Sequence, residues 1–243
     1  DVAALGGLLA GLKRGGELKG SRHYTYDLEN EQADVHAAEI RIENGSYCFD
    51  VHIKQQCIKN MVLNMGGMHN IENATAAIAI AAELGIAEDK IRAAVEAFRG
   101  VKRRFEYIVK TGEQVFVDDY AHHPDELKAL ITGARSLFAG ERMTVIFQPH
   151  LFSRTRDFAD GFAASLDLAD EVILLPIYPA RELPIEGVNS EMIIERMKNK
   201  AVRLLQKNEL VPWVKENSRK VLITAGAGDI DTLVEPVKEA LTQ

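Results

Sequence analysis

The chain has 243 residues, of which 47% are hydrophobic and 27% charged, and its net charge at pH 7 is −7. This length can bury one large core or two modest ones. No apolar run approaches the ~20 residues that a membrane-spanning helix needs. The acidic balance argues against non-specific nucleic-acid binding, which depends on clustered Lys and Arg. Two cysteines are too few for a disulfide scaffold or a zinc motif. We therefore expect a globular cytoplasmic protein that binds neither a membrane nor nucleic acid.

The first hundred residues predict an antiparallel sheet followed by two helices. The strand candidates, rich in β-branched and aromatic side chains, are residues 23–26, 35–42 and 47–53. Asn44-Gly45 between the last two is a strong hairpin signal, because both residues tolerate positive φ. An Ala-rich helix is expected to end at Leu84 with Gly85 as its C-cap, and a second helix to cover residues 87–98.

The rest of the chain alternates apolar strands with helices. The strand candidates are residues 114–117, 143–147, 171–175, 202–204 and 220–224. The helix candidates are residues 125–137, 158–168, 190–198, 210–217 and 230–241. This alternation predicts an α/β fold with a doubly wound, mainly parallel sheet. We place the domain boundary so that residues 1–98 form one domain and residues 99–243 another. Ligands of such sheets bind outside the carboxyl ends of the strands, so the loops at those ends form the candidate site.

The loop after the first of these strands carries two acids, a tyrosine and two histidines. A carboxylate at Asp119 suits a ribose diol, and the imidazoles of His122 and His123 can bind carboxylates or carry protons near neutral pH. The simpler interpretation is a helix start, in which Asp119 takes part in a turn and Pro124 or Asp125 begins the helix. Because functional residues cluster at strand ends of this kind, we favour a functional role for the loop.

The loop after the next strand contributes His150, Arg154 and Arg156. The planar guanidinium of arginine matches carboxylate and phosphate groups. The simpler interpretation is a solvated helix start with the arginines paired to Asp157 and Asp160. We favour a binding role for Arg154, whereas for Arg156 both interpretations stay open.

Two further strand-end loops carry weaker signals. The first is typical of a polar hairpin, with Arg181 paired to Glu182 or Glu186. The second, residues 225–229, has glycines that permit a tight strand-to-helix turn, and anion binding at the following helix start stays open.

Polar residues also stand at the start of the Ala-rich helix, at His69, Asn70 and Asn73. The two asparagines are one turn apart and could read an adenine edge, although an N-cap and a satisfied buried Asn are the simpler interpretation. Near the domain boundary, Arg103 and Arg104 would either clamp phosphates or form a solvated hinge.

Together these residues resemble the Mur ligase family. Residues 67–77, Gly-Met-His-Asn-Ile-Glu-Asn-Ala-Thr-Ala-Ala, resemble its central-domain motif Gly-x-His-Asn-x-x-Asn-x-x-Ala-Ala. Residues 104–106 resemble the Arg-Phe-Glu that begins its C-terminal domain. The loops similar to those of the ligases that attach L-alanine to UDP-N-acetylmuramic acid are residues 117–124, 148–157 and 225–230. The resemblance implies the end of a central ATP-binding α/β domain followed by a C-terminal Rossmann-like domain.

The resemblance also implies a chemistry, that of an ATP-dependent ligase of peptidoglycan precursor synthesis. ATP, with Mg²⁺, would phosphorylate the lactyl carboxylate of UDP-N-acetylmuramic acid, and the amine of L-alanine would attack the acyl phosphate. It assigns nucleotide-binding roles to His69, Asn70, Asn73, Arg104 and Asp119. It assigns catalytic roles at the reacting carboxylate to His122, His150 and Arg154. It assigns substrate binding to Tyr120, His123 and Arg156. Leu151 stands where some members carry an arginine, so Arg154 would carry more of the substrate binding.

Several parts of the family pattern are missing from this sequence. They are the phosphate-binding Gly-rich loop with Lys and Thr, the UDP-binding domain and the magnesium ligands, so no metal ligand is assigned. The resemblance therefore implies a piece of a longer protein, and we expect this piece alone to form no peptide bond. Two alternatives stay open: a related ligase that attaches a recycled tripeptide to the same sugar, and a non-catalytic nucleotide-binding module.

Overall fold

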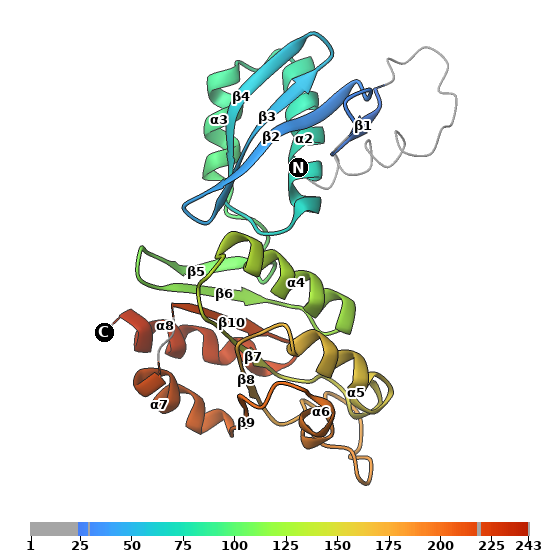
Figure 1. Cartoon of the computed structure of the whole chain (residues 1–243), viewed down its shortest axis with the longest axis vertical. Helices are drawn as coiled ribbons and strands as arrows, with labels where there is room; N and C mark the ends of the chain where they lie inside the picture. The colour runs from blue at the N-terminus through green and yellow to red at the C-terminus, as the bar shows by residue number, and fades with distance from the viewer. Residues whose placement is uncertain (1–23, 29, 218–219, 243) are drawn as a thin grey trace. The chain divides into compact units, whose positions relative to one another are not determined.

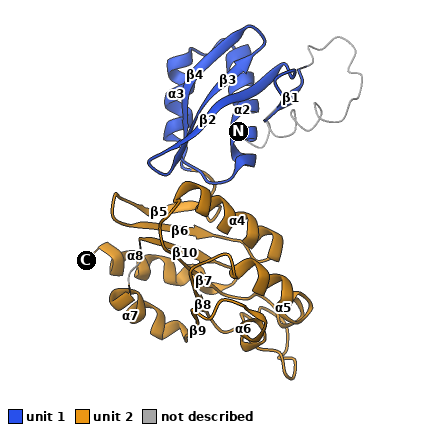
Figure 2. Ribbon diagram, viewed as in Figure 1, with its two compact units in different colours: residues 1–99 blue, residues 100–243 orange. Residues whose placement is uncertain are grey.

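The computed structural model describes residues 24–28, 30–217 and 220–242. It divides the chain into two compact units, Asp1–Arg99 and Gly100–Gln243 (Figure 2). His23 of the first strand candidate lies outside the described residues. Among the described residues, no helix is long and apolar enough to cross a membrane.

The first unit holds a four-stranded sheet in the order β1-β2-β3-β4. Its strands are β1 (Tyr26–Asp27), β2 (Val35–Glu43), β3 (Ser46–Ile53) and β4 (Gln56–Leu63). Strands β2, β3 and β4 are antiparallel neighbours. Asn44 and Gly45 join β2 to β3 with positive φ at both positions, which confirms the predicted hairpin. Helices α2 (Met68–Glu83) and α3 (Glu88–Ala97) pack on the sheet, α2 against β2 and β3, and α3 against β4 (Figure 1).

Strand β4 lies outside the predicted strands because a bulge hides its alternation. The pairing of β3 with β4 shifts register between Phe49 and Val51, and Asn60 has a φ of 56°. As a result Ile58 and Met61, three residues apart, are both fully buried. A spacing of three within a strand breaks the period of two from which strands are predicted.

The second unit holds a six-stranded sheet in the order β5-β6-β10-β7-β8-β9. Its strands are β5 (Glu106–Lys110), β6 (Val115–Asp119), β7 (Met143–Phe147), β8 (Glu171–Leu174), β9 (Val202–Leu204) and β10 (Val221–Ala225). Five strands run parallel, and β5 pairs antiparallel with β6 at the edge. This confirms the predicted doubly wound, mainly parallel sheet, to which the structure adds β5.

The helices of this unit flank the sheet on both sides (Figure 1). They are α4 (Pro124–Leu137), α5 (Phe152–Leu166), α6 (Glu191–Arg196), α7 (Lys207–Asn217), the 3₁₀-helix η1 (Asp229–Leu233) and α8 (Val234–Thr242). Helix α5 begins at Phe152 and not at residue 158 as predicted. Phe158 has non-helical angles (φ −120°, ψ 16°) and interrupts the helix, so only its second part shows a continuous helical period.

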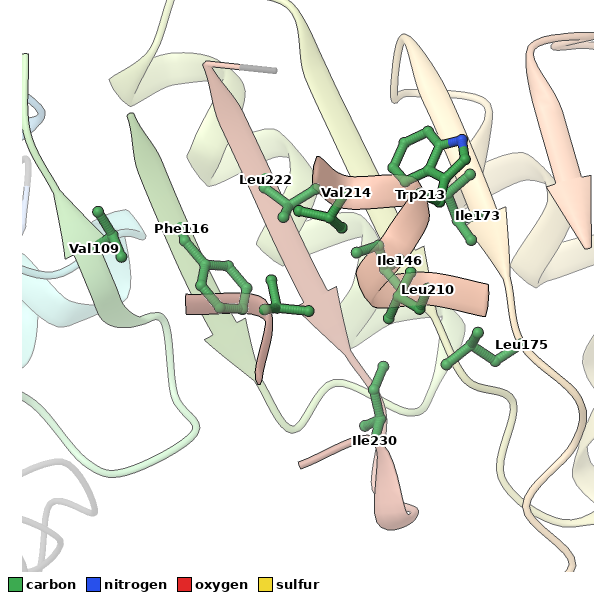
Figure 3. Packing of buried hydrophobic residues seen from close by; sticks show 11 residues of the cluster. Val109, Phe116, Ile146, Ile173, Leu175, Leu210, Trp213, Val214, Leu222 and Ile230 are labelled. Carbon is green, nitrogen blue, oxygen red and sulfur yellow. The ribbon is translucent and has the colours of Figure 1, made fainter. Parts of the chain in front are cut away.

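Helices α7 and α8 cover one face of this sheet (Figure 3). The strand side chains of the apolar cluster include Phe116, Ile146, Ile173 and Leu222. The helix side chains packed with them include Leu210, Trp213, Val214 and Val237. Full burial of such a side chain stabilises the fold by roughly 1.5–3 kcal/mol. Apolar side chains packed on the sheet therefore stabilise the fold, and polar side chains lie at the ends of the strands.

Candidate active site

The polar residues of the second unit gather where its parallel strands end. These strands share one carboxyl edge, so the loops after β6, β7 and β8 meet there. Four rings form a row that we call the aromatic row: Tyr120, His122, His150 and Tyr178. Ring centroids are 5.2 Å apart from Tyr120 to His122, 6.2 Å from His122 to His150 and 5.7 Å from His150 to Tyr178. The structure thus brings three predicted site residues together and adds Tyr178.

Tyr178 belongs to the loop that was predicted to be a polar hairpin. Its backbone N donates to Pro149 O at 2.8 Å, and Leu151 N donates to Tyr178 O at 2.9 Å. These bonds make a parallel bridge between His150 and Tyr178, which extends the sheet past the ends of β7 and β8. The only signal in the sequence was an aromatic residue just past a strand end.

His150 lies against Arg154, one helical turn along α5. Arg154 Nη1 is 3.3 Å from His150 Nδ1. Burial lowers the pKa of His150, and the positive charge of Arg154 lowers it further. Because a guanidinium can only donate, His150 Nδ1 accepts and the hydrogen of the neutral ring is on Nε2. His150 therefore presents a hydrogen-bond donor.

His122 has the opposite arrangement at the start of α4. Its Nδ1 is 2.9 Å from Tyr120 O, and a carbonyl oxygen can only accept, so Nδ1 carries the hydrogen. The lone pair of the neutral ring is then on Nε2. The backbone N of His122 donates to Glu126 Oε2 at 3.0 Å, and the same oxygen lies 3.3 Å from the ring Nδ1, which holds the ring at the start of α4. The two imidazoles of the aromatic row can thus act as one base and one donor.

His123 does not join the aromatic row. It is the N-cap position of α4, and its ring lies 4.7 Å from that of Phe158 on α5. Pro124 begins α4, which confirms the predicted helix start. The role of His123 in substrate binding stays a prediction.

Two acids at the end of β6 are bound to other parts of the second unit. Asp119 accepts from Phe105 N and from Ala121 N, both at 2.7 Å, so the turn interpretation describes its contacts. Burial raises the pKa of Asp119 to about 6. Asp118 accepts from Thr224 Oγ1 at 2.7 Å and from Arg103 Nε at 3.0 Å. Each oxygen of Asp119 keeps a lone pair, so a ribose hydroxyl can still be bound.

The remaining charges of the β7 loop have local partners. Arg156 is half-exposed and pairs with Asp157 at 2.7 Å, whereas Asp160 pairs with Arg196 at 2.9 Å. These contacts fit the solvated helix start. Glu182, expected beside Arg181, instead accepts from Ser153 N at 3.0 Å and from Ser153 Oγ at 2.5 Å. It therefore supplies a negative charge at the start of the helix that carries Arg154.

In the first unit, the predicted nucleotide-binding residues stand at the start of α2. Asn70 Nδ2 donates to Gly66 O at 2.7 Å, while His69 and Asn73 are exposed. The His69 ring lies over Gly67, where an added Cβ would be 2.6 Å from its Cε1. Gly67 has a φ of 95°, a backbone conformation that favours glycine at this helix start. Among the described residues, no group of three or more His, Cys, Asp or Glu side chains could hold a metal ion.

A hollow of about 450 Å³ lies beside the aromatic row. Its walls include Gln148, Tyr178, Lys207 and Asp229. Gln148 Nε2 donates to Asp229 at 2.9 Å, and Lys207 also binds Asp229. The glycines of the loop after β10 allow this packing, because a Cβ on Gly226 would lie 2.8 Å from Gln148 O.

Replacing Gly226 by alanine is expected to lower the free energy of unfolding by about 2 kcal/mol more than the same change at Gly187. Gly226 has a φ of 147° and no room for Cβ, whereas Gly187 has a φ of 74° and nothing within 4 Å of an added Cβ. Urea unfolding of the two variants measures the difference. Equal losses would show that close packing at Gly226 contributes nothing.

Comparison with known proteins follows the same division of the chain. Residues 103–232 match the family model described as Mur ligase, glutamate ligase domain, and residues 10–81 match the Mur ligase middle domain. The UDP-N-acetylmuramate–L-alanine ligase of Flavobacterium psychrophilum is 45% identical over 214 residues, which are 88% of this chain and 48% of the relative. That of Parabacteroides distasonis is 46% identical over 223 residues, 92% of this chain and 48% of the relative. The chain spans about half the length of these curated relatives.

Solved structures show the same fold. The UDP-N-acetylmuramate-alanine ligase MurC of Thermotoga maritima has a TM-score of 0.69 at 28% identity. The match covers 90% of this chain and 48% of the MurC chain. The folylpolyglutamate synthase of Thermotoga maritima has a TM-score of 0.67 at 22% identity, with 92% of this chain and 49% of that one covered. At that identity only the fold is shared. Since one family model matches more than half of the residues and a second matches the preceding unit, the chain belongs to the Mur ligase family.

Proposed function

We propose that the whole protein is an ATP-dependent ligase that joins L-alanine to the lactyl carboxylate of UDP-N-acetylmuramic acid. The observation that carries the proposal is that His122 and His150 lie together at the carboxyl edge of the sheet, with the Nδ1 of His122 beside Tyr120 O and the Nδ1 of His150 beside Arg154. The relatives that are 43–46% identical to this chain are named for that reaction. Peptidoglycan precursor synthesis is the process that it would serve.

The reaction has two steps. The lactyl carboxylate takes the γ-phosphoryl group of ATP and releases ADP, and the amine of L-alanine then attacks the acyl carbon and releases phosphate. ATP supplies the phosphoryl group, and Mg²⁺ would offset the charge on its oxygens. The described residues hold no cluster suited to the metal, so we assign its ligands to other parts of the whole protein.

The residues of the aromatic row fit the second step. Arg154 would bind a substrate carboxylate with its planar fork of donors. His122 Nε2 would take a proton from the attacking amine, which must lose protons to form an amide. His150 Nε2 would donate to the acyl oxygen as negative charge develops there. Tyr120 would contact the substrate, and His123 and Arg156 remain candidates for substrate binding.

Nucleotide binding is proposed for residues of both units. Asn70 Oδ1 and the exposed Asn73 would contact adenine, with His69 beside them. Asp119 would accept from the ribose, and the exposed side chain of Arg104 would contact the phosphates.

Phosphate release from ATP tests the proposal. The whole protein is expected to release phosphate when UDP-N-acetylmuramic acid and L-alanine are both present, because each turnover consumes one ATP. The 243-residue chain alone is expected to release none, since its sequence has no phosphate-binding Gly-rich loop. Phosphate release by the 243-residue chain alone would contradict the expectation that the reaction needs a phosphate-binding loop from elsewhere in the whole protein.

A parallel assay decides between the substrates. Recycled tripeptide replaces L-alanine, and a faster rate with the tripeptide would favour the related recycling ligase. Nucleotide binding without turnover of either substrate would favour a non-catalytic module.

A further inference from the structure

Arg103 is a largely covered arginine that ties together the ends of two strands. Its side chain is 13% exposed, and its partner Asp118 is 2% exposed. Arg103 Nε donates to Asp118 Oδ2 at 3.0 Å, and Nη2 donates to Gly226 O at 2.5 Å. Asp118 is on β6 and Gly226 follows β10, its neighbour in the sheet. A buried charge is kept only where it is paired and hydrogen-bonded, and both conditions hold.

The backbone around Arg103 is held as firmly as its side chain. Tyr120 N donates to Arg103 O at 2.8 Å, and Phe105 N donates to Asp119 Oδ2 at 2.7 Å. Arg103 and Phe105 have φ values of 58° and 48°, in the left-handed region that L-residues avoid. Such conformations persist where the surrounding contacts determine them, and they cluster at functional sites.

Arg104 lies between these two held residues and its own side chain is exposed. The Arg103 guanidinium carbon also lies 5.1 Å from the centroid of the Tyr120 ring, within the range of a cation–π contact. The contacts of Arg103 and Phe105 thus hold the backbone on both sides of Arg104, and the Arg103 side chain lies against the ring of Tyr120.

We propose that Arg103 is a positioning residue, whose bridge from Asp118 to Gly226 presents Arg104 and Tyr120 to the ligands. The inference rests on the proposed function in one respect, that Arg104 and Tyr120 contact ligands. Lysine does not reproduce the bridge, because its donors are all on one nitrogen, whereas Arg103 reaches Asp118 and Gly226 O from two separate nitrogens.

Arg103→Lys tests the bridge in the 243-residue chain. The matched control is Arg135→Lys, because Arg135 also joins a carboxylate, Asp170, at 2.8 Å and a carbonyl, Leu168 O, at 3.1 Å. Asp170 accepts from Met143 N at the start of β7, so this control site lies at the amino-terminal ends of the parallel strands. In backbone amide NMR spectra, Arg103→Lys is expected to shift the signals of Tyr120, Ala121 and Gly226, and Arg135→Lys to leave them in place.

Steady-state kinetics of the whole protein give the second measurement. Arg103→Lys is expected to lower kcat/KM for ATP by about tenfold or more, with a raised KM for ATP, because misplacing a contact group by an ångström has effects of this size. Asp118→Asn should change both measurements in the same direction, since its single amide oxygen cannot serve Thr224 and Arg103 together as a carboxylate does. Arg135→Lys should leave kcat/KM unchanged.

The outcomes separate the two proposals. If Arg103→Lys and Asp118→Asn behave like the control in both measurements, Arg103 is structural only and the inference is overturned. If the unaltered whole protein forms no amide, the proposed function fails, while the shifts at Tyr120 and Gly226 still decide whether Arg103 positions the strand ends.

Discussion

Replacing Arg154 by alanine is expected to lower kcat/KM of the whole protein by about a hundredfold or more, for UDP-N-acetylmuramic acid and for L-alanine. Both substrates bring a carboxylate, and Arg154 lies 3.3 Å from His150 of the aromatic row. Arg154 also holds His150, the proposed donor to the acyl oxygen, and losing one donor that stabilises developing negative charge costs on the order of 10² to 10³ in rate. Steady-state kinetics with each substrate varied in turn measure the loss.

A second effect should accompany the loss of rate. Arg154 lowers the pKa of His150, after burial, by the repulsion of its positive charge. Without that charge the pKa of His150 should rise, so more of the imidazole is protonated near neutral pH. An NMR titration of the His150 ring should therefore give a higher pKa in Arg154→Ala than in the unaltered chain. Arg154→Lys keeps the charge but not the fork, so it should retain the pKa of His150 and still lose rate.

Two other arginines serve as comparisons for Arg154. Arg196 pairs with Asp160 on the surface at 2.9 Å, and Arg196→Ala should leave kcat/KM unchanged. Arg156 is half-exposed and paired with Asp157, so Arg156→Ala should cost less than Arg154→Ala. A larger loss at Arg156 would reverse the assignment of the two arginines.

The parallel sheet of the second unit could be predicted because its strands are short apolar runs between helices. Val115, Val145, Ile173 and Ile223 are buried on such strands, and burial on both faces makes the runs continuous. Strand β5 is an edge strand with a bulge between Tyr107 and Val109, and it shows neither a continuous apolar run nor a regular alternation. Local pattern therefore predicted the parallel strands, including the edge strand β9, but not the bulged antiparallel edge strand β5.

The candidate site was predictable where it depends on strand ends and not where it depends on contacts between distant segments. His122, His150 and Arg154 each follow a strand, and that position alone singled them out. The roles of Tyr178 and Arg103 come from pairing: Tyr178 with His150, and Arg103 with Asp118 and Gly226. No local pattern encodes a contact across more than a hundred residues, such as that from Arg103 to Gly226.

Asp119 shows how a site residue can oppose stability. Its carboxyl group is largely withdrawn from water, and burial, the largest effect on it, raises its pKa to about 6 from an ordinary value of 3.8. The amides of Phe105 and Ala121 favour the charged form but do not offset burial. A pKa raised on folding means that the folded chain binds the proton more tightly than the unfolded chain. The charged form of Asp119 is thus tolerated at a cost.

The sign of the effect follows from these two pKa values. Below about pH 4 both states hold the proton, and the contribution of Asp119 to stability is fully present. It is lost as the pH rises through about 6, where the folded chain must also ionise, and the loss amounts to about 3 kcal/mol. The free energy of unfolding of the 243-residue chain, measured by urea at several pH values, should therefore fall relative to that of Asp119→Asn as the pH rises. Asparagine loses one of the two amide contacts at every pH, which shifts the difference without changing its slope.

Asp125, whose side chain is 94% exposed, provides the control, and Asp125→Asn should show no such pH-dependent difference. A difference between the unaltered chain and Asp119→Asn that stayed constant or grew in favour of the unaltered chain would mean that Asp119 is not held against ionisation.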